Sequence, residues 1–294
     1  MGLILPFCAF LCGIVLARKY SDASSYLKKL LSSLLARLFI PVIIVYNMVF
    51  YQPGRLWLIG FSFLSSILLF SIFYYLQKDK LNALCFSYLN GAWLGFPLAL
   101  VVFGAEASSI IVALYIGGSV FGNVCAVIAL SEHQQSVTNI SKNILQSPPI
   151  IALMLAGLLS FYSLASLETH PIIQAIYQLD KILVTFSGMC ILGMWLSHVA
   201  VTWSDLQQSL KLIGHRLWAA MLLCLMAYFL LPIPHELLTY AVMMMFFCLP
   251  PAANIVALET HYRGTGSSAK IIASGTIASV IVILFYGALW QFWV

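Results

Sequence analysis

Long apolar stretches alternate along the chain with short polar segments that contain charged residues, glycine or proline. A helix needs about 20 residues to cross the hydrocarbon core of a membrane. Ten stretches approach or exceed this length, at approximately 2–17, 31–51, 55–76, 83–103, 108–130, 148–166, 175–199, 211–231, 236–259 and 268–293. The pattern therefore predicts an all-α polytopic membrane protein with ten transmembrane helices.

The composition excludes a water-soluble globular protein. Of the 294 residues, 62% are hydrophobic and 8% are charged, whereas a soluble domain has roughly 45–50% and 25%. So few charged side chains do not cover the surface of a soluble protein of this size. Ten spans also leave no room for a sizeable soluble domain, so the net charge of +5 is not read as a nucleic-acid-binding signal.

The cations gather on one side of the predicted topology. With ten spans, the loops of one side contain only Arg55, while Arg37 and Lys181 lie within spans. The loops of the other side contain Arg18, Lys19, Lys28, Lys29, Lys78, Lys80, Lys142, Lys211, Arg216, Arg263 and Lys270. Because cytoplasmic loops are enriched in Lys and Arg, we expect a plasma (inner) membrane protein with both termini outside.

The longest polar stretch divides the chain into two halves. Residues 131–147 are predicted to form a cytoplasmic linker between 1–130 and 148–294, each with five spans. If the halves are structural repeats, an odd number of crossings inverts the second relative to the first, as in many secondary transporters. The expected fold is therefore two inverted five-helix repeats.

Two spans contain matching irregularities near their centres. Span four contains Asn90-Gly91-Ala92-Trp93-Leu94-Gly95-Phe96-Pro97, and span nine contains Leu249-Pro250-Pro251-Ala252-Ala253-Asn254. Proline removes a backbone donor and glycine relaxes the chain, so both helices should open here. Pro97 and Pro251 are each expected to begin a second half-helix, whose N-terminus would attract an anion. The alternative is that both positions are simple proline kinks.

At these residues the sequence resembles the auxin efflux carrier family, which includes the plant PIN proteins and bacterial carriers of malonate and other organic acids. The stretch Asn90–Pro97 is similar to the family's Asn-Thr-Gly-Phe-Leu-Gly-Leu-Pro-like motif, with Gly91 in place of Thr and Trp93 in place of Phe. Ser147–Leu153 is similar to Asn-Pro-Pro-Ile-Ile-Ala-Leu, and Leu249–Asn254 follows the ninth-helix pattern.

The resemblance implies a ten-helix transporter in which broken helices 4 and 9 cross at the substrate site. Helices 1, 2, 6 and 7 would form a scaffold that often mediates a homodimer, and helices 3–5 and 8–10 a mobile transport domain with an elevator mechanism. The implied substrate is a small organic anion, either a dicarboxylate such as malonate or an auxin-like carboxylic acid. The predicted substrate-binding residues are Asn90, Gly91, Trp93, Gly95, Pro97, Pro250, Pro251 and Asn254.

Three charged residues near span ends are candidates for coupling or gating: Asp180, Lys181 and Glu259. Adjacent helical residues do not face one another, so a solvated aspartate and a snorkelling lysine are the alternative interpretation of the first two. A coupling ion, either Na⁺ or H⁺, stays open. The seven cysteines lie in apolar runs without CxxC or Cys/His spacing, so no metal site and no cofactor are expected.

An enzyme is not expected, because the chain contains no HExxH, GxSxG or paired-aspartate motif of the kind that marks catalytic sites. The alternatives to an organic-anion carrier are a sodium-coupled carrier similar to the bile-acid symporters, a channel, and a membrane scaffold without transport activity.

Overall fold

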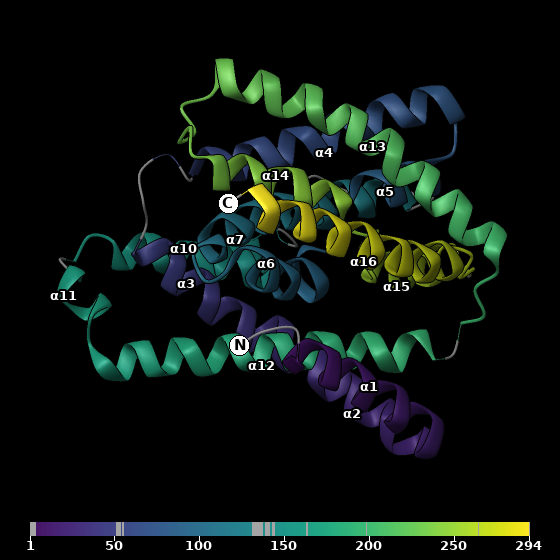
Figure 1. The fold of residues 1–294 in the computed structure, drawn as a ribbon, viewed down its shortest axis with the longest axis horizontal. Helices are drawn as coiled ribbons and strands as arrows, with labels where there is room; N and C mark the ends of the chain where they lie inside the picture. The colour runs from purple at the N-terminus through teal and green to yellow at the C-terminus, as the bar shows by residue number, and fades with distance from the viewer. Residues whose placement is uncertain are drawn as a thin grey trace.

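The computed structural model describes residues 4–50, 54, 56–130, 138, 142, 145–162, 164–197, 199–263 and 265–293. These residues form a bundle of helices (Figure 1). In chain order the helices are α1 (Ile4–Lys19), α2 (Ser21–Leu34), α3 (Ile40–Val49), α4 (Leu56–Gln77), α5 (Lys80–Ser87), α6 (Phe96–Phe103), α7 (Ala107–Phe121), α8 (Val127–Leu130), α10 (Pro148–Leu159), α11 (Ala165–Glu168), α12 (Pro171–Leu196), α13 (Trp203–Leu230), α14 (Leu237–Cys248), α15 (Asn254–Arg263) and α16 (Ser268–Trp293). Three π-helical segments, η1 (Leu35–Phe39), η2 (Gly91–Gly95) and η3 (Gly122–Ala126), continue into the helices that follow them.

Several helices are long and apolar enough to cross a membrane. Six such helices lie in the described part of the chain: Ala23–Val49, Leu56–Gln77, Ala107–Cys125, Pro171–Leu196, Trp203–Leu230 and Ser268–Phe292. Shorter apolar helices cover Gly91–Phe103, Pro148–Leu159 and Leu237–Cys248. The predicted class, an all-α multi-pass membrane protein, is confirmed at this level.

The distribution of apolar and polar side chains is that of a molecule surrounded by lipid. Large apolar residues such as Leu64, Phe229 and Phe285 are exposed on the outside of the bundle, whereas Asn47 and Ser62 are buried inside it. Ser62 donates a hydrogen bond to the carbonyl oxygen of Leu114 at 2.6 Å. A polar group buried away from water needs such a partner, and the apolar exterior needs a hydrocarbon solvent.

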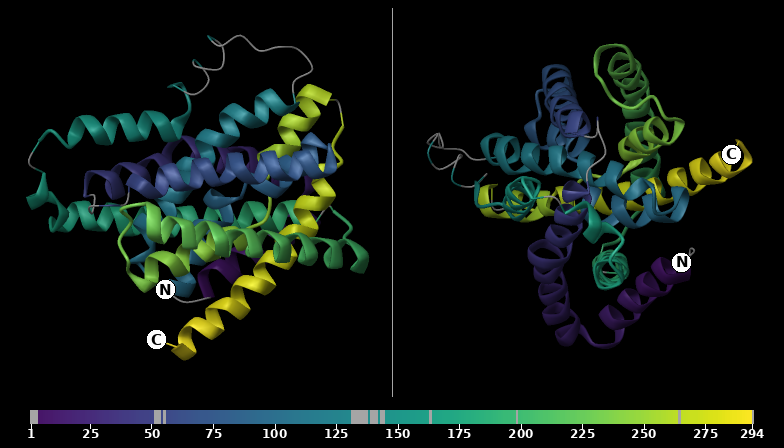
Figure 2. Two further views of the ribbon diagram at one scale, coloured as in Figure 1. Left: turned by 90° about the horizontal axis from the view of Figure 1, so that it is seen from above. Right: turned by 90° about the vertical axis from the view of Figure 1, so that its left-hand side faces the viewer.

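The helices form two groups on opposite sides of the bundle. In Figure 1, α12 runs along the bottom and α13 along the top. Helix α1 packs along α12, and α3 packs against α10, while α4 packs against α7, and α13 against α14 and α16. Figure 2 (right) shows α1 and α2 on one side, with α4 and α13 on the other.

Two glycines bring α1 and α12 into backbone contact. A Cβ atom on Gly13 would overlap the carbonyl oxygen of Cys190, and one on Gly193 would overlap that of Phe10. Small residues at a helix interface let two backbones approach closely in a membrane, where packing rather than hydrophobicity drives helix association. The long α1–α12 contact depends on both positions.

Some helix boundaries differ from the predicted ones. Helix α13 begins at Trp203, whereas the predicted span begins at 211, because Thr202 and Asp205 form a capping box that satisfies free N–H groups of the first turn. Helix α10 ends at Leu159, well before the predicted 166. Most of the predicted linker 131–147, and Arg55, lie outside the described residues.

Candidate functional site

Both predicted interruptions are present in the structure. Helix α5 ends at Ser87, and helical structure resumes at Gly91 in η2 and continues through α6. Helix α14 ends at Cys248, and α15 begins at Asn254. The residues between them, 88–90 and 249–253, are not helical.

The two non-helical segments cross and pair with each other. Leu89 and Pro251 form an isolated antiparallel bridge. The backbone N–H of Asn90 donates to the Pro250 carbonyl oxygen at 2.9 Å, and the N–H of Ala252 donates to the Tyr88 carbonyl oxygen at 2.8 Å. In a membrane, backbone groups released from a helix must find partners inside the protein. The crossing supplies them for these four residues.

The sequence explains why each segment opens. Pro250 and Pro251 have no N–H to donate, and a proline disfavours the helical conformation in the residue before it. Leu249 accordingly adopts extended angles of φ −65° and ψ 151°. In the other segment, a Cβ atom on Gly95 would lie 2.7 Å from the Leu249 side chain, so glycine permits the close approach of the two segments.

A cavity of about 200 Å³ lies at the crossing. Its lining residues come from both interrupted segments and from the helices beside them: Ala36, Ile40, Tyr88, Leu89, Asn90, Gly91, Ala92, Trp93, Tyr115, Ser119, Asn123, Pro148, Pro149, Ala252, Ala253 and Asn254. None of these residues carries a charged side chain. The N-terminal ends of η2 and α15 both border the cavity, so the positive ends of two helices lie there.

Asn90 presents an unused hydrogen-bond donor at the cavity. Its side chain is 5% exposed. Its Oδ1 atom accepts a hydrogen bond from the backbone N–H of Trp93 at 3.2 Å, which caps η2. Its Nδ2 atom is buried and has no hydrogen-bond partner among the described residues. A buried amide without a partner costs free energy, so a ligand that accepts a hydrogen bond would stabilise this site.

Asn254 stands on the other side of the crossing. Its Nδ2 atom donates to the hydroxyl oxygen of Tyr88 at 2.9 Å, and its side chain is exposed. Because Tyr88 belongs to the first interrupted segment and Asn254 begins α15, this hydrogen bond joins the two halves of the site.

Of the eight predicted substrate-binding residues, the structure brings Asn90, Gly91, Trp93 and Asn254 together around the cavity. The other four do not line it. Gly95 packs against Leu249, Pro250 contributes a backbone acceptor, Pro251 packs against Gly275 of α16, and Pro97 faces a different cavity.

The expectation that Pro97 and Pro251 begin the second half-helices is wrong. Helical structure restarts at Gly91, six residues before Pro97, because the Asn90 side chain caps it there. It restarts at Asn254 after the second break, three residues beyond Pro251, because Pro251 and Ala252 take part in the pairing across the crossing.

Several polar residues that line the cavity were not predicted from the sequence. Tyr88, Tyr115, Ser119 and Asn123 all border the cavity. The last three are spaced four residues apart on α7 and η3, so they follow one face of the helix. A polar side chain at every fourth position of an otherwise apolar span is the signal that could have identified them.

A second cavity of about 360 Å³ lies beside α6 and α12. Its lining includes Pro97, Gly104, Gln178, Lys181 and Thr185. Lys181 is 7% exposed, and its ammonium lies 4.6 Å from the centre of the Tyr177 ring.

Asp180 is also buried, at 5% exposure, and its Oδ2 atom has no hydrogen-bond partner among the described residues. The interpretation of Asp180 as solvated and of Lys181 as snorkelling to the membrane surface is therefore wrong. Both side chains are held inside the bundle on α12.

Glu259 lies away from both cavities. Its side chain is fully buried, and its carboxylate accepts hydrogen bonds from Thr265, Ser267 and Ser268. These residues precede or begin α16, so the carboxylate caps the positive end of that helix. This contact orders the connection between α15 and α16.

The described residues contain no group of three His, Cys, Asp or Glu side chains that could hold a metal ion. No protein-family model matches the chain, and no curated protein is significantly similar to it. The geometry of the crossing is therefore the main basis for a functional assignment.

Proposed function

We propose that the protein is a secondary transporter that moves a small organic anion across the membrane by elevator-type alternating access. The observation that carries this proposal is the cavity at the crossing, where the buried Asn90 amide has an unused donor and two helix N-termini meet. Carboxylates accept hydrogen bonds from such groups, and the helix N-termini add favourable partial charge. The site would thus bind an anion without a charged side chain.

The helix packing supports two inverted five-helix repeats. In such a fold the first repeat comprises α1, α2–α3, α4, α5–α6 and α7–α8, and the second α10, α12, α13, α14–α15 and α16. The contact of α1 with α12 then corresponds to the contact of α10 with α3 in the other repeat. In the same way, the contact of α4 with α7 corresponds to the contact of α13 with α16. The crossing of the interrupted helices lies between the repeats.

The same packing supports the division into a scaffold and a transport domain. Helices α1, α2–α3, α10 and α12 contact one another, as expected of a scaffold through which a homodimer would form. Helix α12 meets the transport domain at Gly188, where a Cβ atom would lie 2.6 Å from the Trp93 carbonyl oxygen. Because glycine has no side chain at this contact, α12 and the transport domain present smooth surfaces that could slide past one another.

The two cavities suit alternating access. We define the Lys78 end of the bundle as the end that contains Lys78 and Thr202, and the Gly104 end as the opposite one. Successive helices run in opposite directions, so the side of the central cavity that is lined by Ala36, Asn123 and Pro148 lies toward the Lys78 end. The second cavity borders Gly104 and therefore lies toward the Gly104 end. We propose that the Lys78 end is cytoplasmic in the plasma (inner) membrane, and that both termini lie outside.

The size of the central cavity favours a small substrate. Its volume of about 200 Å³ is below the roughly 300–1,000 Å³ of sites for drug-sized ligands. A dicarboxylate such as malonate therefore fits the proposal better than an auxin-like indole acid.

The test is uptake by proteoliposomes that contain the purified protein, with labelled malonate and an indole carboxylic acid as alternative substrates. We expect malonate uptake, and we expect Asn90→Ala and Asn254→Ala to reduce it at least about tenfold, because each removes a hydrogen bond worth roughly 1.5–3 kcal/mol to a charged group. Asn82→Ala is the matched control, because the Asn82 amide donates to Asp79 at the start of α5, away from the cavity.

Equal uptake by the wild type, Asn90→Ala and Asn254→Ala would contradict the assignment of the site. Uptake of neither compound by wild-type protein, together with normal folding, would favour a membrane scaffold. A conductance without saturable uptake would favour a channel.

A further inference from the structure

A buried arginine joins the two interrupted helices. Arg216 lies within α13 and is 3% exposed. Its Nε atom donates to the Phe247 carbonyl oxygen at 2.6 Å, and its Nη2 atom donates to the Leu249 carbonyl oxygen at 2.6 Å. Its Nη1 atom donates to the Phe86 carbonyl oxygen at 3.3 Å. The topology predicted from the sequence puts this residue in a cytoplasmic loop, and that prediction is wrong.

The three acceptors are the carbonyl groups at the ends of two half-helices. Phe86 belongs to the last turn of α5, Phe247 belongs to the last turn of α14, and Leu249 follows that helix. The final carbonyl groups of a helix have no partner within it and carry the negative end of the helix dipole. The negative C-terminal ends of α5 and α14 therefore meet at the crossing, and the guanidinium group of Arg216 lies between them.

Arg216 has no acidic partner among the described residues, where the single ion pair joins Lys270 and Asp205. Removing an ion from water costs several kcal/mol even after relaxation. The carbonyl oxygens of Phe86, Phe247 and Leu249 must compensate this cost. In transporters with discontinuous helices, unwound carbonyls and half-helix C-termini of this kind are the groups that coordinate a coupling cation.

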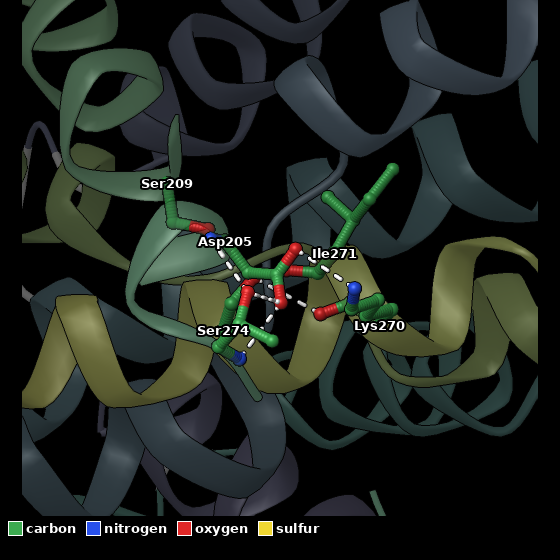
Figure 3. A network of polar contacts seen from close by, with 6 residues as sticks. Asp205, Ser209, Lys270, Ile271 and Ser274 are labelled. Atoms are coloured by element: carbon green, nitrogen blue, oxygen red, sulfur yellow. Dashed lines mark hydrogen bonds and ion pairs between the residues drawn. The ribbon is translucent and has the colours of Figure 1, made fainter. Parts of the chain in front are cut away.

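The position of Arg216 is fixed by contacts between α13 and α16. Figure 3 shows Asp205 and Ser209 of α13 facing Lys270 and Ser274 of α16. Lys270 lies 3.0 Å from Asp205, and the hydroxyl oxygens of Ser209 and Ser274 are 2.8 Å apart. Ser209 and Arg216 are seven residues, about two turns, apart, so they lie on the same face of α13. The helix is thereby held in the register that points Arg216 at the crossing.

We propose that Arg216 is a tethered cation that occupies a carbonyl site at the crossing, where a free coupling cation would otherwise bind. Two consequences follow. Removal of its charge opens a site for a small monovalent cation, and the wild-type protein transports its substrate without Na⁺ at this site. The second consequence rests on the proposed transport function, whereas the first does not.

Thermal unfolding in detergent tests the first consequence. We expect Arg216→Ala to melt about 10 °C below the wild type, because loss of one member of a buried charge interaction leaves its partners uncompensated. Millimolar guanidinium should raise the melting temperature of this variant by about 3 °C, because it binds to the carbonyl groups that Arg216 leaves free. Na⁺ should have the same effect relative to choline at equal ionic strength. Lys211→Ala is the matched control, since Lys211 is an exposed cation on the same helix.

Two further variants separate charge from packing. Arg216→Gln keeps a polar side chain without the charge, so we expect it to fold and to gain the response to Na⁺. Arg216→Lys keeps a cation at the site, so we expect it to lose stability without gaining that response. A specific stabilisation of the wild type by Na⁺, or no response of either uncharged variant to Na⁺ and guanidinium, would overturn the proposal.

Uptake by wild-type proteoliposomes tests the second consequence. We expect the same rate when Na⁺ is replaced by choline on both sides, and a rate that depends on a Na⁺ gradient would contradict it. A protein that takes up no anion in any buffer, but whose uncharged Arg216 variants respond to Na⁺ in unfolding, would refute the transport function while supporting the cation site.

Discussion

Asn90 has two separate roles that belong to the two ends of one amide group. The Oδ1 atom caps η2 through the backbone N–H of Trp93, while the Nδ2 atom is left without a partner at the cavity. The first role is structural and the second is available to a ligand. A substitution that changes only one end can therefore distinguish them.

Asn90→Asp is that substitution. It keeps an oxygen that accepts from Trp93, and it replaces the free donor with a negative charge. We expect malonate uptake to fall about 100-fold, because a charge-assisted hydrogen bond is lost and a like charge faces the anion. Both variants should melt below the wild type, because Asn90→Asp buries an unpaired carboxylate and Asn90→Ala removes the cap, so uptake rates are compared on folded protein.

The measurements are the initial uptake rate in proteoliposomes and thermal unfolding in detergent. Uptake by Asn90→Asp at the wild-type rate would show that the amide does not face the substrate.

Arg216 shows where residue-level interpretation failed. A cation close to a predicted span boundary was assigned to a loop because Lys and Arg are costly within a membrane. In the structure, the carbonyl oxygens of Phe86, Phe247 and Leu249 accept hydrogen bonds from Arg216 and compensate this cost. Those acceptors are not recognisable from the sequence, since any residue has a backbone carbonyl.

At the scale of elements, proline and glycine marked where the two helices open, but not where they resume. Opening depends on local backbone chemistry at Pro250 and Pro251. Resumption at Gly91 and Asn254 depends on the side-chain cap of Asn90 and on the pairing of Leu89 with Pro251. The pairing joins segments that are far apart in the chain.

The contact of α12 with η2 leads to a prediction about motion. A methyl group at Gly188 would lie 2.6 Å from the Trp93 carbonyl oxygen, which belongs to the backbone and cannot rotate away. We expect Gly188→Ala to lower the melting temperature by about 5 °C, because overpacking costs typically 1–3 kcal/mol. We also expect slower malonate uptake, because Trp93 borders the cavity.

Gly157→Ala in α10 is the matched control, because no atom lies within 4 Å of its Cβ position. Thermal unfolding and uptake should both be unchanged in this variant. Wild-type stability and uptake in Gly188→Ala would mean that the α12–η2 contact separates more readily than the structure indicates.

At the scale of the whole molecule, ten cations still mark one end when Arg216 is left out. The connections at the Lys78 end and the helix ends next to them contain Arg18, Lys19, Lys28, Lys29, Lys78, Lys80, Lys142, Lys211, Arg263 and Lys270. The proposal that this end is cytoplasmic therefore does not depend on Arg216.

Labelling of introduced cysteines with a membrane-impermeant maleimide tests this orientation. Starting from a variant in which the exposed Cys8 and Cys12 are replaced by serine, a cysteine is introduced at exposed positions of either end. In intact cells we expect labelling of Glu106→Cys and Glu236→Cys, which lie at the Gly104 end. We expect no labelling of Lys80→Cys until the membrane is permeabilised.

Labelling of Lys80→Cys in intact cells, with protection of Glu106→Cys, would reverse the proposed orientation. Labelling of all three would show that the chain does not separate its two ends across a membrane.

The sequence by itself determined the class of the protein, the approximate positions of its helices, the two interruptions and four of the residues that line the cavity. These properties depend on residues close together in the chain: runs of apolar side chains, the missing N–H groups of Pro250 and Pro251, and the glycines beside Asn90. Hydropathy and backbone chemistry are local, so they can be read in order along the sequence.

Only the tertiary structure decided which polar groups meet at the crossing. Asn254 reaches Tyr88 across 166 positions of the chain, and Arg216 reaches Phe86 across 130. The burial of Asp180 and Lys181, and the contribution of Tyr115 and Ser119 to the cavity, likewise depend on how the helices pack. Such contacts are set by the geometry of several elements together, because in lipid each buried polar group must be satisfied by whichever neighbour the fold supplies.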